Sequence, residues 1–226
     1  MAALLADDRA AVAAACRDLA REGLVKGTSG NVSVRRGDLV AISPGSVAYE
    51  GMTADDVCVV DMSGRAVDAT RSPSSELRMH LGVYARTDAT AAVHTHSPYA
   101  SVLSTLLDEL PAIHYMIVTL GGPVPVTDYR LFGTEELAAA AAAALEDRHA
   151  VILGSHGGLT VGDSLDAAYA RAVTLEWLCA LYYRATRAGE PRIMTPGQLA
   201  DVAAQMRHYA TEKETFRPVS APGLGP

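Results

Sequence analysis

Cysteine is scarce in this sequence, and long apolar runs are missing. The three cysteines among 226 residues, Cys16, Cys58 and Cys179, are far apart and form no Cys-x-x-Cys pair. This spacing excludes a disulfide framework and a thiolate zinc site, and it favours small buried residues in a reduced protein. No segment reaches 18 uncharged apolar residues, so we expect no membrane span. The N-terminal stretch lacks a basic start followed by an unbroken apolar run, so we expect no signal peptide and a cytoplasmic location.

Positive charge is also in deficit. Lys and Arg number 19 against 26 Asp and Glu, which gives a net charge of −7. Nucleic acids need clustered cations, so this balance argues against a nucleic-acid partner, while a local cationic pocket for a small anion stays open. The chain contains neither the G-x-G-x-x-G nor the Walker pattern, and it has no internal repeat. These absences exclude the common dinucleotide-binding and solenoid architectures.

Short strands and helices alternate along the chain. Helix signals cover residues 7–23, 74–87, 97–107, 134–148, 164–189 and 195–212. Paired short strands are predicted at 32–43, 55–68 and 149–162, with one further strand at 90–96. Tight hairpins between the strands favour an α/β layered fold, with a central mostly antiparallel or mixed sheet flanked by helices. We expect a single domain over residues 1–212 and a flexible tail over 213–226.

The segment "AAVHTHSPYA" places His94 and His96 two positions apart, at the end of the predicted strand. Alternate side chains of a strand share a face, so both imidazoles lie on one side and Thr95 on the other. Two imidazoles in this arrangement can bind one metal ion. The spacing is short and common, so two histidines that only form hydrogen bonds are the alternative.

A catalytic zinc ion usually has three protein ligands and one open position. Five other histidines are available as the third ligand: His80, His114, His149, His156 and His208. His156 lies in the turn "GSHGGLTVG", where glycines allow other groups to approach closely, so we select His94, His96 and His156. Glu76, at the start of the helix after "PSS", is the candidate catalytic base; its alternative role is to complement the helix dipole.

Two segments could bind an anion. Ser74 and Ser75 precede a helix, where their hydroxyls can cap it and the free backbone N–H groups attract negative charge. In "GTSGN", Thr28 and Asn31 can supply donors around a phosphate, or the segment is a simple turn before a strand.

Six segments together resemble the class II aldolase/adducin family. They are "GLVKGTSGNVSVR", "PSSELRMHLGVY", "AAVHTHSPYAS", "PAIHYMIVTLGG", "YRLFGTEEL" and "SHGGLTVG", in the order of the family over residues 10–210. The resemblance implies a zinc-dependent aldolase that reversibly cleaves a ketose 1-phosphate, such as L-fuculose 1-phosphate, to dihydroxyacetone phosphate and an aldehyde. Another divalent metal could replace zinc.

The resemblance also assigns residues. It implies that His94, His96 and His156 bind the zinc, and that Glu76 is the catalytic acid/base and a further ligand of the substrate-free site. It places the substrate phosphate on Thr28, Asn31, Ser43, Gly45, Ser74 and Ser75. It implies a homotetramer in which Tyr115 reaches the site of a neighbouring subunit, acts there on the aldehyde oxygen, and Tyr209 closes over the site.

Two departures and two alternatives accompany the resemblance. Loop 43–46 reads "SPGS" where such aldolases often read Thr-Pro-Thr-Gly, so a glycine replaces one hydroxyl donor. The chain beyond Tyr209 also differs from the short ending of the family. A 4-epimerase of a ketopentose phosphate or a dehydratase of a methylthio-ketose phosphate uses the same scaffold, although Glu76 and Tyr115 favour the aldolase over the epimerase. A non-catalytic adducin-like module is disfavoured by the retained histidines.

Overall fold

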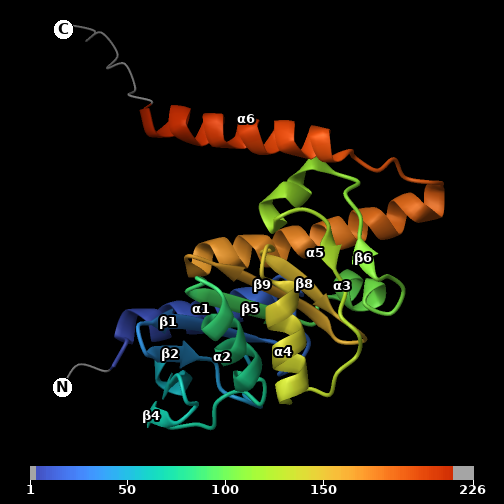
Figure 1. Ribbon diagram of the computed structural model, residues 1–226. Coiled ribbons are helices and arrows are strands. Elements are labelled where there is room, and N and C mark those ends of the chain that lie inside the picture. The colour runs from blue at the N-terminus through green and yellow to red at the C-terminus, as the bar shows by residue number, and fades with distance from the viewer. Residues whose placement is uncertain (1–3, 216–226) are drawn as a thin grey trace, which may run out of the picture.

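The computed structural model describes residues 4–215, and the side chains as far as residue 211. One seven-stranded sheet forms its centre, in the order β4-β3-β2-β1-β5-β9-β8, with every neighbouring pair antiparallel (Figure 1). Its strands are β1 (Asn31–Arg36), β2 (Leu39–Ile42), β3 (Cys58–Asp61), β4 (Ala66–Asp68), β5 (Ala91–Thr95), β8 (Ala150–Leu153) and β9 (Gly157–Gly162). The predicted α/β fold with an antiparallel sheet is therefore confirmed.

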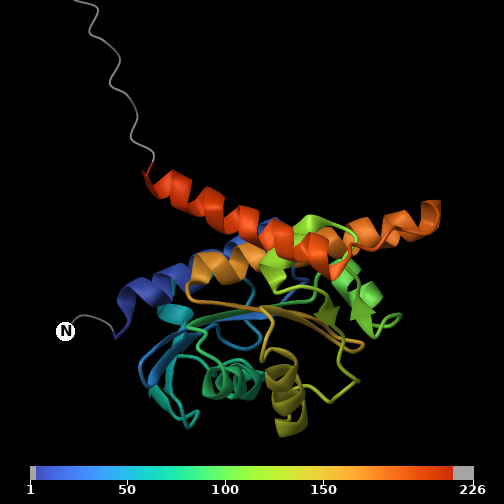
Figure 2. The same ribbon diagram turned by 45° about the horizontal axis from the view of Figure 1, so that its top comes forward.

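Helices cover both faces of the sheet. The α-helices of the described residues are α1 (Ala6–Arg21), α2 (Leu77–Arg86), α3 (Pro98–Leu103), α4 (Glu135–Ala144), α5 (Leu165–Ala188) and α6 (Pro196–Thr215). Figure 2 shows the layers: α2 and α4 lie against one face, and α1 and α5 against the other. A short pair, β6 (Glu109–Leu110) and β7 (Val124–Pro125), and two 3-10 helices, η1 (Ala54–Asp56) and η2 (Tyr115–Leu120), complete the described elements. The sequence patterns had not predicted η1, η2 or β6.

Alternation along the strands places apolar side chains on both faces of the sheet. In β1, Val32 and Val34 pack with α1 and α5, on one side of the sheet. In β2, Val40 and Ile42 pack with α2 and α4, on the other side. The same alternation in β1 turns the polar Asn31 and Ser33 away from the α1 core, so β1 presents polar groups to α2. This polar strip within an otherwise apolar layer leads to the site.

Several helix ends match their sequence signals. The Thr134 hydroxyl accepts a hydrogen bond from the Leu137 N–H at the start of α4, and Gly189 ends α5. The start of α2 differs from the prediction, because Glu76 is its N-cap and the Ser74 hydroxyl accepts from the Glu76 N–H instead of capping the first turn. Helix α6 continues to Thr215, three residues past its predicted end, and the rest of the predicted tail, 216–226, lies outside the described residues.

None of the helices between residues 4 and 215 combines the length and apolar character that crossing a membrane requires.

Candidate metal centre and the adjoining cleft

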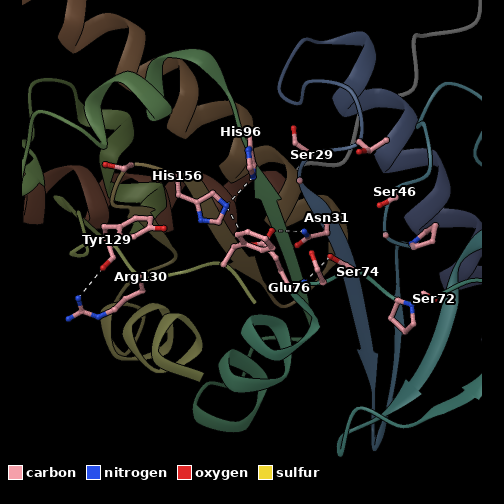
Figure 3. Close-up of a pocket in the computed structure, with 18 residues that line it drawn as sticks. Ser29, Asn31, Ser46, Ser72, Ser74, Glu76, His96, Tyr129, Arg130 and His156 are labelled. Carbon is pink, nitrogen blue, oxygen red and sulfur yellow. Dashed lines mark hydrogen bonds and ion pairs between the residues drawn. The ribbon is translucent and has the colours of Figure 1, made fainter. Parts of the chain in front are cut away.

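Three histidines and one glutamate converge where the ends of three segments meet. His94 is in β5, and His96 follows that strand by one residue. His156 lies in the turn between β8 and β9, and Glu76 is the N-cap of α2. Figure 3 shows His96, His156 and Glu76 pointing toward one another. The pairing of β5 with both β1 and β9 sets this arrangement, because it holds the end of β5 beside the β8–β9 turn.

The ligand atoms of these four side chains all lie within 4.8 Å of one another. The Nε2 atom of His96 lies 3.0 Å from that of His94 and 3.1 Å from that of His156. Glu76 places Oε2 3.1 Å from His94 Nε2 and Oε1 3.4 Å from His156 Nε2. The predicted grouping of His94, His96, His156 and Glu76 is therefore present.

The chemistry of this cluster fits a divalent metal ion. His94 Nδ1 lies 2.9 Å from the carbonyl oxygen of Gly158, which can only accept, so this nitrogen carries the hydrogen and Nε2 presents its lone pair to the cluster. Glu76 Oε1 is buried and has no hydrogen-bond partner within the described residues. Buried lone pairs that face one another repel unless a cation lies among them. A fixed tautomer, three convergent nitrogens and a carboxylate form a donor set that zinc prefers.

The titration properties of the cluster favour metal-binding forms. Burial, and then the neighbouring His94, lower the pKa of His96 and of His156 to about 4. Burial opposes ionisation of Glu76, but His94, His156 and the Asn31 amide outweigh it, and they hold the pKa of this carboxyl below its ordinary value. At neutral pH, His96 and His156 are therefore neutral and Glu76 is ionised, as metal binding requires.

A cleft of about 720 Å³ opens beside the cluster. Its walls are the segments 28–31, 44–46, 72–76 and 155–156, together with His96, Tyr129, Arg130 and Phe132. The hydroxyls of Thr28, Ser46, Ser72 and Ser75 line it and form no hydrogen bond with any described residue. Arg130 is the one cationic residue of this lining among the described residues, and Figure 3 shows it pointing away from the histidines. Neutral donors next to the start of α2 therefore dominate the cleft.

Most of the predicted phosphate ligands line this cleft. Thr28, Asn31, Gly45, Ser74 and Ser75 all belong to its wall. Backbone bonds hold two of these segments together, from the Gly45 N–H to the Ser72 carbonyl at 3.0 Å and from the Ser74 N–H to the Ser43 carbonyl at 3.2 Å.

Ser43 is placed differently from this group. Its side chain is fully buried, and its hydroxyl accepts a hydrogen bond from the Val32 N–H at 3.1 Å. The Ser43 hydroxyl thus connects the loop 43–46 to β1 by a hydrogen bond, and Ser43 does not line the cleft.

Glycine allows the loop before β1 to approach the metal centre. Gly30 has φ +78°, and a β-carbon on it would lie 2.7 Å from the His94 carbonyl oxygen. The Tyr49 hydroxyl donates to the Gly30 carbonyl at 2.5 Å and fixes the loop from inside the core. The segment "GTSGN" therefore lies directly against the strand that carries His94.

Tyr115 and Tyr209 are absent from the cleft. They line a separate apolar pocket with Met116, Val202 and Met206, where η2 meets α6. About half of each of these two tyrosine side chains is exposed to solvent, at 47% and 57%. Within one chain the two tyrosines thus line the same pocket, on a surface apart from the metal cluster.

Sequence reasoning missed Tyr129 and Phe132, which line the outer part of the cleft and are both exposed. The available signal was the pair of aromatic residues in "DYRLFG", a segment that ends in a glycine. It also treated His80 only as a rejected metal ligand, although this residue connects to the site through Asn31.

The fold and the site together define a metal-binding α/β protein with a polar cleft, and comparisons with known proteins identify its family. The class II aldolase and adducin N-terminal domain matches residues 10–183. The chain is 37% identical to a 5-deoxy-D-ribulose 1-phosphate aldolase of Bacillus thuringiensis serovar kurstaki, over 92% of this chain and all of that one. It is 36% identical to an L-fuculose phosphate aldolase of Escherichia coli K12, over 88% and 94% of the two chains.

A solved L-fuculose 1-phosphate aldolase superposes with a TM-score of 0.86 at 36% identity, covering 92% of this chain and 98% of that one. The chain belongs to the class II aldolase and adducin family. With its cluster of three histidines and a glutamate, it is a class II aldolase, a metal-dependent aldehyde-lyase that acts on sugar phosphates.

Proposed function

We propose that this enzyme cleaves a ketose 1-phosphate whose carbon chain ends in a methyl group, and that zinc is its metal. Two of the relatives, at 37% and 36% identity, are named for 5-deoxy-D-ribulose 1-phosphate and for L-fuculose phosphate, and a solved structure at 36% identity is named for L-fuculose 1-phosphate. Both sugars end in a methyl carbon, and cleavage between C3 and C4 releases dihydroxyacetone phosphate from each. The second product is acetaldehyde from the first sugar and lactaldehyde from the second.

The arrangement of the cleft supports this substrate class. Neutral hydroxyl and N–H donors lie at the start of α2, where a phosphate group is stabilised. Tyr129 and Phe132 line the outer part and offer apolar surface to a terminal methyl group. The metal cluster borders the same cleft through Glu76, His96 and His156. One bound sugar phosphate can therefore contact all three regions.

Zinc held by His94, His96 and His156 supplies Lewis-acid stabilisation of the negative charge that develops during cleavage. Glu76 is the acid/base for the carbon next to the carbonyl, because its Oε1 carries no hydrogen bond and faces the cluster. In the direction of cleavage C3 must gain a proton when its bond to C4 breaks, and Glu76 returns it. The phosphate site holds the substrate away from the breaking bond, so its binding energy fixes the reacting geometry.

A second copy of the chain would complete the site. The C4 hydroxyl must lose its proton as the aldehyde forms, and the wall of the cleft contains no second histidine or carboxylate beyond those of the metal cluster among the described residues. Tyr115 and Tyr209 lie together on an exposed apolar face at the junction of η2 and α6. We propose a homotetramer in which this face reaches the cleft of the next subunit, so that Tyr115 acts on the C4 oxygen and Tyr209 closes the site.

Product release tests the proposed reaction. The zinc-loaded enzyme is incubated with 5-deoxyribulose 1-phosphate or L-fuculose 1-phosphate, and the dihydroxyacetone phosphate released is trapped by reduction to glycerol 3-phosphate. We expect turnover of at least one of the two, and none with a ketopentose 5-phosphate, which has no phosphate on C1. Absence of dihydroxyacetone phosphate from both sugars, or epimerisation of the 5-phosphate, would overturn the proposal.

A further inference from the structure

A chain of buried polar groups runs from Glu76 into the layer between β1 and α2. Glu76 Oε2 accepts a hydrogen bond from Asn31 Nδ2 at 3.0 Å, and Asn31 Oδ1 contacts His80 Nε2. The other ring nitrogen of His80, Nδ1, lies 2.6 Å from Ser33 Oγ, which lies 2.7 Å from the Tyr84 hydroxyl. All five residues are at least 95% buried. Water therefore contributes little to this line of polar groups, and its members satisfy one another's hydrogen-bonding capacity.

Strand β1 and helix α2 bring these groups together because side chains on one face recur at similar distances along each of them. Asn31 and Ser33 are two residues apart in β1 and share the face toward α2, with a rise of about 6.7 Å between them. Glu76, His80 and Tyr84 are four residues apart along α2, so they form one row with a rise of about 6 Å per step. A strand and a helix side by side thus interleave five polar groups in one line.

The direction of every hydrogen bond in this line is fixed. An ionised carboxylate only accepts, so Asn31 must present its amide N–H to Glu76 and its carbonyl oxygen to His80. That oxygen requires a hydrogen on His80 Nε2. Burial, and then the nearby His94, lower the pKa of His80 to about 3 against the opposing effect of Glu76, so the ring is neutral and Nδ1 accepts from the Ser33 hydroxyl. Tyr84 is left to donate to Ser33.

The line leaves the two carboxylate oxygens of Glu76 unequal. Oε2 receives the Asn31 N–H, whereas Oε1 has no hydrogen bond and lies 3.4 Å from His156 Nε2. Without the His80 N–H, the Asn31 amide could rotate and turn its oxygen toward the carboxylate, which would repel it. The second N–H of the Asn31 amide stays available to a ligand, because Asn31 also lines the cleft.

We propose that His80 is a positioning residue for Glu76: it locks the Asn31 amide, which holds Oε2 and leaves Oε1 to carry the proton of the reaction. The proposal rests on the proposed role of Glu76 as the acid/base. Ser33 and Tyr84 also take part, since their hydroxyls fix the tautomer of His80 through its Nδ1 atom. No proton moves along the line. Its function is to keep the Asn31 amide oriented with its N–H toward Glu76.

The first test needs neither substrate nor variant. Nitrogen-15 NMR of the metal-free protein, labelled at histidine, distinguishes the two neutral tautomers and the charged ring. We expect His80 in the neutral form with its hydrogen on Nε2 at neutral pH. A hydrogen on Nδ1, or a charged ring, would overturn the proposal, and this result does not depend on whether the sugar phosphates are cleaved.

The second test separates positioning from packing. His80→Phe keeps a ring but removes the donor, whereas His80→Gln restores an N–H near the position of Nε2. We expect kcat of His80→Phe to fall about 10- to 100-fold, with KM changed less than about 3-fold and zinc content unchanged. His80→Gln should recover most of the lost kcat. Met79→Leu is the matched control, because Met79 is equally buried in α2 but packs in the apolar core.

A packing role gives a different pattern. Both variants at position 80 would then lower the melting temperature, and the kcat of each folded protein would stay near wild type. Equal loss of kcat in the Gln and Phe variants would also overturn the proposal, since only the Gln variant keeps the donor. If His80→Phe does not fold, Ser33→Ala provides the alternative: it removes the donor to Nδ1, and we expect the Nε2 tautomer to lose its predominance in the NMR spectrum.

Discussion

The Nε2 atoms of His94 and His96 lie 3.0 Å apart, although His94 has its hydrogen on the opposite nitrogen, where it is bonded to the Gly158 carbonyl. The Nε2 lone pair of His94 thus points into a cluster whose other members are further imidazole nitrogens and a carboxylate. A divalent cation offsets the repulsion between these lone pairs. Without a cation, His96 and His156 must supply the hydrogens that separate them. The pair therefore links metal binding to the stability of the fold.

Removing any one of the three histidine ligands should release the metal. We expect His94→Ala, His96→Ala and His156→Ala each to lose zinc, as measured by elemental analysis of the purified protein, and to lose activity with the fold retained. His149→Ala is the control, because His149 is exposed and outside the cluster. Zinc added to the metal-free wild type should raise the free energy of unfolding by about 2.7 kcal/mol at a hundredfold excess over Kd. Full zinc occupancy in one of the three variants would remove that residue from the ligand set.

Glu76→Gln should separate metal binding from catalysis. The three imidazoles remain in this variant, so we expect it to retain zinc, while turnover falls by at least ~10² because the amide cannot exchange the proton. The glutamine is of the same size, so circular dichroism should match wild type. Turnover near that of wild type would show that Glu76 is not the acid/base and serves only as the N-cap of α2.

The anion site can be tested through one hydroxyl. Ser75 lines the cleft and makes no hydrogen bond to a described residue, so Ser75→Ala removes a donor without leaving an unpaired group. We expect KM for the sugar 1-phosphate to rise about 10- to 150-fold, equivalent to the roughly 1.5–3 kcal/mol of one hydrogen bond to a charged group. The same change should have little effect on the unphosphorylated sugar. Ser63→Ala, in the β3–β4 turn, is the control, and an equal effect on both sugars would contradict the phosphate assignment.

Acid should destabilise the metal-free protein partly through His80. Its pKa is lowered to about 3 by burial, whereas an unfolded histidine has a pKa near 6.5. Between these values the unfolded chain binds a proton that the native state does not, so the free energy of unfolding falls as the pH falls, by up to about 1.4 kcal/mol per pH unit from this residue. Urea unfolding at several pH values should give a shallower dependence for His80→Gln than for wild type. Identical slopes would show that His80 titrates normally.

The sequence contained enough information to predict the layers and the grouping of His94, His96 and His156. Hairpin turns, and the residues Thr134 and Gly189 at helix ends, are recognised from a few neighbouring residues. The helices and strands that begin or end at them could therefore be predicted. His94 and His96 are also a local pair, and the glycines around His156 mark a turn that can approach them. These signals need no knowledge of which strand lies beside which helix.

Other features depend on pairing between distant segments. The line from Glu76 through Asn31 to His80 exists only because β1 lies against α2 in one register, which no local pattern specifies. The burial of Ser43 has a similar origin, since its hydroxyl bonds to the neighbouring strand β1. Tyr115 and Tyr209 line one pocket because α6 packs against η2, and spacing along the chain could not have placed them there together.

The proposed sharing of sites between subunits can be tested with two inactive variants. Glu76→Gln lacks the acid/base, and Tyr115→Phe lacks the hydroxyl that we propose acts in the neighbouring cleft. The two proteins are mixed in equal amounts, dissociated and reassembled. With random neighbours, roughly a quarter of the sites receive an intact Glu76 from one chain and an intact Tyr115 from the next. Activity should therefore return to about that fraction of wild type.

Two controls make this outcome decisive. Each variant dissociated and reassembled alone should stay inactive, and native mass spectrometry should show that mixed oligomers have formed. A site built within one chain cannot be repaired in this way, because every chain carries one lesion. If verified mixed oligomers are as inactive as their parents, Tyr115 does not act across an interface. If Tyr115→Phe alone is nearly as active as wild type, the tyrosine packs against α6 and takes no part in the chemistry.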